Sequence, residues 1–515
     1  MLAFRAIGFA ICAALCGSLL PLPVRAQHDH PVPEKLGKVN FPVSCSRSVQ
    51  TSFNHAVALL HSFAYVAAQQ GFAVIVQRDP QCAMAHWGIA ISYYHQLWDP
   101  PISLSDLQLG ATEIQRAQDL SDRADDREKA FINALAVFYS AASRSSVRLA
   151  ALAYANAMRE AASQNSDDTE SQIFYALSFL SIASPADPAH TNLKLSAQML
   201  EPLFQRYPDH PGLAHYLVHA YDLPDLARQG LPAARAYAKI APSAPHALHM
   251  PSHIFTLLGM WPDSIRSNLA ARLAARQQGD VGEELHAMDY LMYGELQAGR
   301  FASAAKLLTD LRAMSNLPVA EYKVAYAATV MPIRFVIERH QWDDALNISA
   351  DPVAAPQFRA IAEWANSVAA AHLGKTPEAE LHLHNLQNLF AEVRTAGDDY
   401  WTSQVQIQAA EAEGWLAHVR GDEQQAASSL RAAADQQDRL AKRPITPGPV
   451  IPAREQLADL LLETKQFSEA LREYELVLKH SPGRRNALSG AARAAELSGD
   501  SAKAKQFSLQ FQALH

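Results

Sequence analysis

Leu457 to Pro482 reads LADLLLETKQFSEALREYELVLKHSP, and the pattern of this stretch decides the fold. Ala470 is a small residue of the kind that lets two helices cross closely, and Tyr474 supplies an aromatic ring that packs between them. Proline cannot continue a helix, so Pro482 marks the end of the second helix of this unit. Ala504 repeats the position of Ala470 in a further unit, which predicts an array of helix pairs.

The same pattern recurs along most of the chain. A glycine that permits a turn is followed five residues later by a small residue that lets two helices approach. Prolines fall where the second helix of a unit should stop. The glycine and small-residue pairs are Gly259/Ser264, Gly299/Ala304, Gly374/Ala379, Gly421/Ala426 and Gly499/Ala504, and the prolines are Pro80, Pro208, Pro242 and Pro482.

These residues resemble the tetratricopeptide repeat, with small residues at repeat positions 8 and 20, an aromatic at 24 and proline at 32. The resemblance covers most of the chain and is weaker between about Leu104 and Leu203. It implies an all-α, right-handed superhelical solenoid of antiparallel helix pairs, in one elongated or ring-closed array. No glycine-rich phosphate loop, strand alternation or nucleophile elbow interrupts the pattern, so we expect no separate catalytic domain.

Histidines recur in register with the repeat. Placing Pro242 at position 32 puts His249 and His253 at positions 5 and 9 of the next first helix. His215 and His219 hold the same positions one repeat earlier. Residues four apart lie on one face of a helix, so each pair points one way, and stacked repeats bring the pairs together.

Other polar residues extend this strip. His246 and His286 take position 2 of two successive repeats, and Asp289 and Tyr293 follow at positions 5 and 9 of the second. By resemblance to tetratricopeptide proteins, positions 2, 5, 9 and 12 of the first helix line a concave groove. The expected groove residues are His246, His286, Tyr293, Arg334, Glu455 and Asp459. His61 and His95 form a weaker second stripe, and Glu170 has a softer register.

Neutral imidazole is the commonest metal ligand, and two at i and i+4 can chelate one ion. We therefore predict a transition-metal site, for Zn, Cu, Fe or Ni rather than calcium. The residue after His215 is Tyr216, not the glutamate of a zinc protease, so the spacing alone is weak. The alternative is a polar network in which the histidines bond one another, Tyr216, Asp222 and Ser252. The predicted metal ligands are His215, His219, His249, His253 and Asp289.

Three functions remain open at this point. The first is a groove protein that binds a partner segment or small ligand, with a metal participating. The second is a metal-dependent enzyme, in which Asp289 or Glu455 acts as base and Arg334 orients an anionic substrate. The third is a metal-free interaction scaffold. The segments HYLVHAYD, from His215, and APSAPHALHMPSHIF, from Ala241, are similar to those of exported bacterial tetratricopeptide proteins without an assigned reaction, which supplies no mechanism.

The first 26 residues read as a secretory signal. Arg5 precedes an apolar stretch, and Val24-Arg25-Ala26 offers a cleavage site. A membrane anchor is the alternative, but the apolar run is short for a span. We expect a periplasmic or secreted protein without a transmembrane anchor. Losing Arg5 and Arg25 changes the net charge from −8 to −10, which argues against a nucleic-acid partner.

The remaining chain divides by its pattern. We expect a mobile tail over 27–40, N-terminal repeats over 41–203, a central array with the histidine groove over 204–442, and C-terminal repeats over 453–515. The proline-rich stretch 443–452 is expected to be a rigid connector. Cys45 and Cys82 fit one disulfide between the first repeats, or two buried free thiols. At 49% hydrophobic residues, the chain can bury a large core.

Overall fold

Helices in the structure end where the glycines and prolines of the repeat predict. Pro208 lies two residues after the end of α8 (Thr191–Arg206), and Pro482 two residues after the end of α23 (Phe467–His480). Each turn glycine stands between two helices with a positive φ, a conformation that other residues rarely adopt. These φ values are 66° at Gly259, 71° at Gly299, 69° at Gly374, 81° at Gly421 and 85° at Gly499.

The computed structural model describes residues 34–97, 102–184, 187–346, 348–440 and 442–514. The expected signal peptide and residues 27–33 of the expected tail lie outside these ranges. The described residues are helical with intervening turns, and they contain no strand. Residues 35–515 form one unit. Its α-helices are α1 Gln50–His61, α2 Tyr65–Arg78, α3 Ala83–Tyr94, α4 Leu104–Asp119, α5 Asp126–Ala142, α6 Val147–Gln164, α7 Thr169–Ser181, α8 Thr191–Arg206, α9 Pro211–Ala220, α10 Leu231–Ile240, α11 Pro245–His249, α12 Pro251–Leu257, α13 Trp261–Gln278, α14 Val281–Gln297, α15 Phe301–Ala313, α16 Tyr322–Ile337, α17 Trp342–Ala345, α18 Pro356–His372, α19 Thr376–Ala396, α20 Asp399–Val419, α21 Glu423–Gln437, α22 Ala453–Glu463, α23 Phe467–His480, α24 Arg485–Ser498 and α25 Ser501–Gln512.

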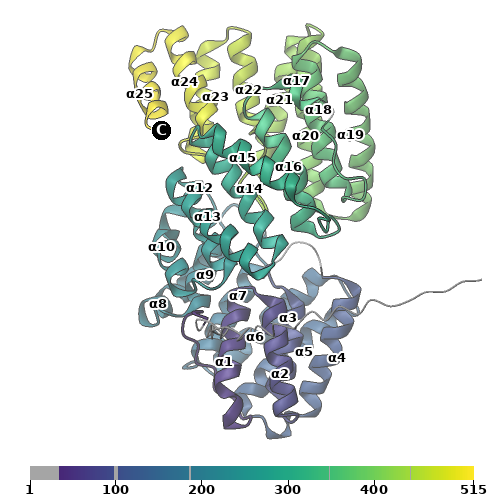
Figure 1. Cartoon of the computed structure of the whole chain (residues 1–515), viewed down its shortest axis with the longest axis vertical. Helices are drawn as coiled ribbons and strands as arrows, with labels where there is room; N and C mark the ends of the chain where they lie inside the picture. The colour runs from purple at the N-terminus through teal and green to yellow at the C-terminus, as the bar shows by residue number, and fades with distance from the viewer. Residues whose placement is uncertain (1–33, 98–101, 185–186, 347, 441, 515) are drawn as a thin grey trace, which may run out of the picture. The chain divides into compact units, whose positions relative to one another are not determined.

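Successive helices pack as antiparallel pairs, which Figure 1 shows most clearly from α18 to α24. The region of weaker sequence resemblance has the same arrangement, because α3 packs on α4, α5 on α6 and α7 on α8. Small residues make the close crossings: Ala304, Ala379 and Ala426 are fully buried. Tyr474 packs so closely on the next helix that a Cβ at Gly490 would lie 2.2 Å from its ring. The protein is therefore a tetratricopeptide-like array of helix pairs.

The proline-rich stretch 443–452 packs against helices that lie far back in the chain, as well as joining α21 to α22. The hydroxyl of Tyr290 on α14 lies 2.9 Å from the carbonyl oxygen of Thr446. The guanidinium of Arg334 on α16 donates to the carbonyl oxygen of Pro449 at 2.9 Å. Ile445 and Ile451 are buried. This stretch thus occupies the surface of α14 and α16 that a partner segment was expected to contact.

The N-terminal part of the described chain is anchored in two ways. Cys45 and Cys82 form a disulfide, with their Cα atoms 4.9 Å apart. Upstream of it, within the stretch expected to be a mobile tail, the backbone N–H of Lys35 donates to the hydroxyl of Ser243 at 2.9 Å. Lys38 forms an ion pair with Asp209. Among the described helices, none has both the length and the apolar character needed to cross a bilayer.

Candidate metal centre

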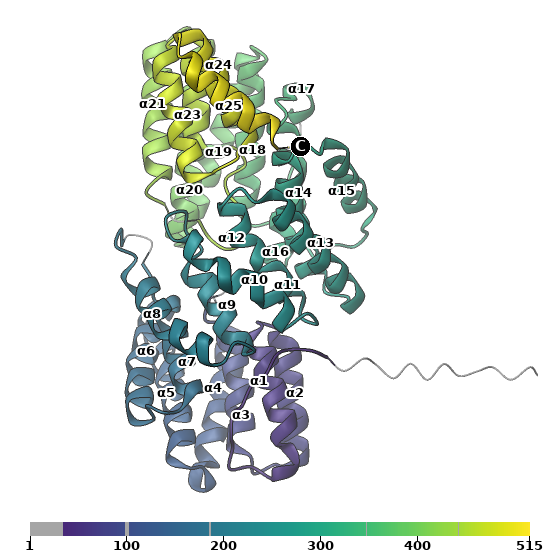
Figure 2. The ribbon, with the colours of Figure 1, turned by 90° about the vertical axis from the view of Figure 1, so that its left-hand side faces the viewer.

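Six histidines gather from four helices. His215 and His219 lie on α9, His246 and His249 on α11, His253 on α12 and His286 on α14. Prolines at the first position fix where α9, α11 and α12 begin, since the missing N–H of proline costs nothing there. Figure 2 shows α9, α10, α11 and α12 grouped together, and α11 also contacts α14.

The six imidazoles form two groups of three. The first triad is His215, His219 and His246, and the second triad is His249, His253 and His286. Within each triad, one nitrogen from every ring lies within 4.8 Å of the others. The two sequence pairs therefore do not converge on a single ion. Each pair is completed by a third histidine that had been expected only to line the groove.

Hydrogen bonds fix the protons of the second triad. The Nδ1–H of His253 donates to the carboxylate of Asp222 at 2.8 Å. The Nδ1–H of His249 donates to Oδ1 of Asn268 at 2.7 Å, and the amide nitrogen of Asn268 donates to the carbonyl of Ser264. A neutral imidazole has only one N–H, so the Nε2 atoms of both histidines carry lone pairs. These two Nε2 atoms nevertheless lie 3.0 Å apart.

Two lone pairs at this distance repel unless a cation lies between them. A proton could serve, but burial lowers the pKa of His249 to about 3 and also lowers the pKa of His253. Both rings are therefore neutral near pH 7. Two nitrogens bound to one ion at about 2.0–2.1 Å lie roughly 2.9–3.6 Å apart for angles of about 90–120°. The observed separation fits two ligands of one metal ion.

The first triad has a similar arrangement around His215. Its Nδ1–H donates to the carbonyl oxygen of His61 at 2.6 Å, which leaves Nε2 unprotonated. That single lone pair faces the Nε2 atoms of His219 at 3.1 Å and of His246 at 3.2 Å. Burial lowers the pKa of His219 to about 3 as well. These distances again match nitrogens that share one ion.

A carboxylate stands behind one histidine of each triad. Asp222, which accepts from His253, also pairs with Lys442 at 2.9 Å. Glu283 forms an ion pair with Lys323, and its other oxygen lies 3.5 Å from Nδ1 of His246. Metal-binding histidines commonly donate their second N–H to a carboxylate, which orients the ring and raises its basicity. Sequence reasoning placed Asp222 only in the polar-network alternative, and it did not identify Glu283, Lys323, Lys442 or Asn268.

One small cavity connects the two triads. His219 and His246 line it from the first triad, and His253 and His286 line it from the second. Its volume is about 30 Å³, enough for a water molecule. The other lining residues are mostly apolar and close the cavity around the histidines: Phe63, Leu97, Met250, Lys323, Pro444 and Ile445.

Asp289 and Arg334 lie away from the imidazoles. Both are fully buried, and Nε of Arg334 lies 3.4 Å from a carboxylate oxygen of Asp289. The guanidinium of Arg334 also donates to backbone carbonyls of the stretch 443–452 and lies over the ring of Tyr293. Asp289 was expected to bind metal and Arg334 to orient a substrate. The structure instead brings them together as a buried pair.

Glu455 and Asp459 also lie outside both triads. Glu455 holds Arg484 through two hydrogen bonds of 2.6 and 2.8 Å, and Glu338 holds the same guanidinium from the other side. Tyr474 donates to Asp459. Burial raises the pKa of both Glu455 and Asp459 to about 7. The Arg484 contact makes Glu455 part of a buried ionic network.

A third group of possible ligands is arranged around a carboxylate. Nε2 of His61 and Nε2 of His210 each lie 3.0 Å from an oxygen of Glu170. Both N–H groups can donate to the carboxylate, while Nδ1 of His61 accepts from the hydroxyl of Tyr216 at 2.9 Å. No pair of lone pairs is opposed here. The carboxylate of Glu170 thus accounts for the close approach of both histidines to it.

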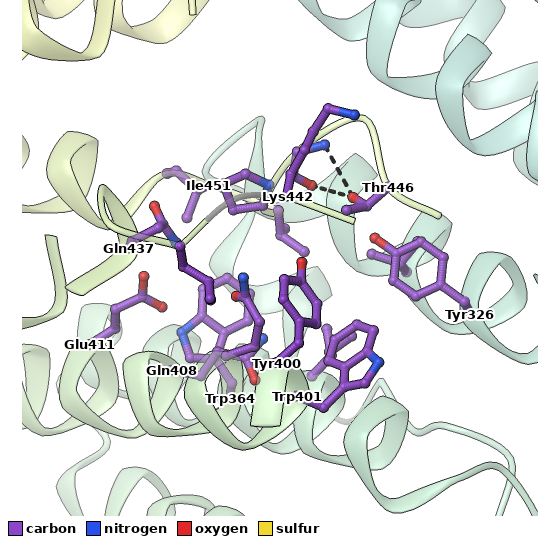
Figure 3. A pocket seen from close by; sticks show the side chains of 17 residues that line it. Tyr326, Trp364, Tyr400, Trp401, Gln408, Glu411, Gln437, Lys442, Thr446 and Ile451 are labelled. Carbon is purple, nitrogen blue, oxygen red and sulfur yellow. Dashed lines mark hydrogen bonds between the residues drawn. The ribbon is translucent and has the colours of Figure 1, made fainter. Parts of the chain in front are cut away.

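Figure 3 shows a separate pocket beside the stretch 443–452. Tyr326, Trp364, Tyr400 and Trp401 supply aromatic walls, and the buried carboxyl of Glu411 lies at one side. Burial raises the pKa of Glu411 to about 8. The carboxyl is therefore largely protonated at pH 7.

We expect Glu411→Gln to change how stability depends on pH. Below the unfolded pKa near 4.5 the carboxyl is protonated in both states, and above it the folded state retains its proton up to about pH 8. The free energy of unfolding therefore decreases as the pH rises from about 4.5 to about 8, by up to about 1.4 kcal/mol per pH unit. Thermal unfolding should show that the stability of the variant, relative to that of the wild type, increases as the pH rises from 5 to 8. Glu413 is exposed on the same helix, so the stability of Glu413→Gln should depend on pH as that of the wild type does. The same pH dependence for Glu411→Gln would contradict the raised pKa of Glu411.

No protein-family model and no curated protein matches the sequence. Among solved structures, the chain is similar to the human IFIT1 dimer with PPP-AAAA, with 13% identity and a TM-score of 0.40 over 90% of each chain. It is also similar to the TPR domain of P58(IPK), with 11% identity and a TM-score of 0.24, covering 88% of this chain and 99% of that one. These likenesses are loose, so the fold assignment rests on the helix pairs themselves.

Proposed function

We propose that this chain is an exported metal-binding protein, whose tetratricopeptide-like scaffold holds one transition-metal ion in each histidine triad. The observation that carries the proposal is the 3.0 Å separation between two Nε2 atoms, of His249 and His253, whose other nitrogens already donate to Asn268 and Asp222. A metal ion replaces the repulsion of two lone pairs by two coordinate bonds. The pattern of the first 26 residues supports export.

The ligand chemistry favours zinc, copper, iron or nickel. Imidazole nitrogens suit these ions, whereas calcium and magnesium prefer oxygen ligands. Three protein ligands leave a fourth position for a water or another small ligand. The carboxylates of Asp222 and Glu283 take the supporting role that is common around bound histidines.

The metal-free alternative requires the triads to be ordinary hydrogen-bonded networks. In the second triad, a hydrogen bond between the two Nε2 atoms would move the N–H of His253 or His249 from Nδ1 to Nε2. A lone pair on Nδ1 would then face the oxygen of Asp222 at 2.8 Å or of Asn268 at 2.7 Å, which is unfavourable. Of the proposed bases, Asp289 contacts Arg334 and Glu455 contacts Arg484, so neither supports an enzyme at this site.

Elemental analysis of tag-free protein tests the proposal. After incubation with each candidate metal and removal of loosely bound ions, we expect two ions per chain. The double variant His249→Ala, His253→Ala should retain one ion, in the first triad, and His215→Ala, His219→Ala should retain one, in the second. The combined variant should retain none.

His382→Ala, His418→Ala is the matched control, because these two histidines contact carboxylates outside both triads. This control should bind two ions like the wild type. Circular dichroism should show that every variant keeps its helices. Wild-type protein that binds none of the four metals would overturn the proposed function, as would variants that lose no metal.

A further inference from the structure

We propose that the two triads act as a single dinuclear copper centre, which binds a small bridging anion in the cavity between them when the copper is oxidised. This inference rests on the proposed function, because it assumes that each triad holds an ion.

The two triads adjoin each other. The ring centres of His246 and His249, from different triads, are 6.2 Å apart, and those of His219 and His253 are 6.4 Å apart. The widest ring separation within each triad is 6.5 Å. The rings of these two pairs are thus no farther apart than rings within one triad. Two ions bound here would be near neighbours.

The cavity gives both ions access to one ligand. Histidines of both triads line it, and its volume of about 30 Å³ accommodates a ligand of one or a few atoms between them. Phe63 closes the side of the first triad, with its ring centre 4.3 Å from that of His215. The backbone of Phe63 has a φ of 55°, a strained conformation for a residue with a side chain. Pro444 and Ile445 of the stretch 443–452 contribute to the opposite wall.

The charges around the triads favour copper among the imidazole-binding metals. All six side chains are imidazoles, a ligand type that brings no negative charge to a metal ion, and the nearby carboxylates Asp222 and Glu283 already pair with Lys442 and Lys323. Two divalent ions would therefore add four positive charges to a buried site without an anionic ligand, at high cost. Two cuprous ions add only two. Copper is the metal in this group with a stable monovalent state.

Oxidation supplies the reason for an anion. When two equivalents of a one-electron oxidant of the ferricyanide class each take one electron from a cuprous ion and are reduced to ferrocyanide, the site gains two positive charges. A water molecule that enters the cavity can lose a proton to solvent, and the resulting hydroxide neutralises part of that charge while contacting both ions. Lys323, whose ammonium pairs with Glu283, also lines this cavity.

Magnetic resonance of the copper-loaded full chain tests this inference. Protein loaded with two cuprous ions under nitrogen is oxidised with ferricyanide, and the copper content is measured on the same sample. A bridging anion couples the two cupric spins, so we expect less than a tenth of the signal of two isolated cupric ions. Each single-triad double variant should bind one copper and give the full signal of one spin.

Azide is the probe for the small anion. It should produce a new charge-transfer absorption in the oxidised two-copper protein, and at least tenfold higher concentrations should be needed in the single-triad variants. Two coppers with the full signal of two independent spins would overturn the dinuclear centre and leave the proposed function intact. Two bound zinc ions without copper binding would overturn the copper assignment, and no metal at all would overturn both proposals.

Discussion

Replacing Arg484 by methionine should destabilise the protein by about 3–5 kcal/mol, because the substitution leaves buried carboxylates without their cation. Arg484 is fully buried and makes two hydrogen bonds to Glu455 and two to Glu338. It precedes α24, whereas Glu338 follows α16 and Glu455 lies on α22. The guanidinium therefore holds three separate helix pairs together. Denaturant unfolding of the purified chain measures the loss.

The stability of the Arg484→Met variant should also depend on pH. Burial already raises the pKa of Glu455, and without the guanidinium this carboxyl binds its proton still more tightly in the folded state than in the unfolded state, so stability rises as the pH falls. Replacing all three groups, with Glu338→Gln and Glu455→Gln added to Arg484→Met, should recover much of the lost free energy. Arg493→Gln, which breaks an exposed pair with Glu496, should cost less than about 1 kcal/mol. A similarly small cost for Arg484→Met would show that Glu455 is free to act as the groove base that its repeat position suggested.

Removing the disulfide should lower the free energy of unfolding by about 4 kcal/mol. Cys45 and Cys82 are 37 residues apart, and closing a loop of this length restricts the unfolded chain by about that amount at 25 °C. The bond ties the segment before α1 to the start of α3, where α1, α2 and α3 pack. The double variant Cys45→Ser, Cys82→Ser should therefore unfold at a lower denaturant concentration than the oxidised wild type.

A reductant provides the control for this measurement. It should bring the wild type to the stability of the double variant and leave the variant itself unchanged. Equal stability of oxidised and reduced wild type would indicate the other interpretation of the sequence, two buried free thiols. Disulfides persist mainly in oxidising compartments, so the outcome also bears on the proposed export.

The histidine site shows what repeat register can and cannot predict. The spacing of His215 with His219 predicted two rings on one face of a helix, and their Nε2 atoms lie 3.1 Å apart on α9. His249 and His253 have the same spacing and their Nε2 atoms lie 3.0 Å apart, although His249 ends α11 and His253 lies on α12. Register also brought His246 and His286 into the same strip. It did not indicate the division into two triads, because ring orientation depends on which acceptor holds each Nδ1–H. Those acceptors come from α13, from the turn after α9 and from the backbone of His61.

Asp289 is a residue whose neighbours repeat register did not predict. Its repeat position predicted a place beside the imidazoles, but a buried carboxylate takes the strongest available cation, and Arg334 lies 3.4 Å away on the next repeat. Arg334 in turn is fixed by carbonyls of Gly448 and Pro449, more than 110 residues later in the chain. No local pattern specifies such a contact.

The sequence by itself determined the helix pairs, since glycine, proline and small residues act through local backbone geometry and close crossings that recur with the repeat. It also determined that several imidazoles would share one strip, because a helix repeats its faces every three to four residues. Only the tertiary structure decided which imidazoles form a triad, which carboxylates stand behind them and which are neutralised by arginine. Those choices depend on competition among buried polar groups brought together from distant parts of the chain.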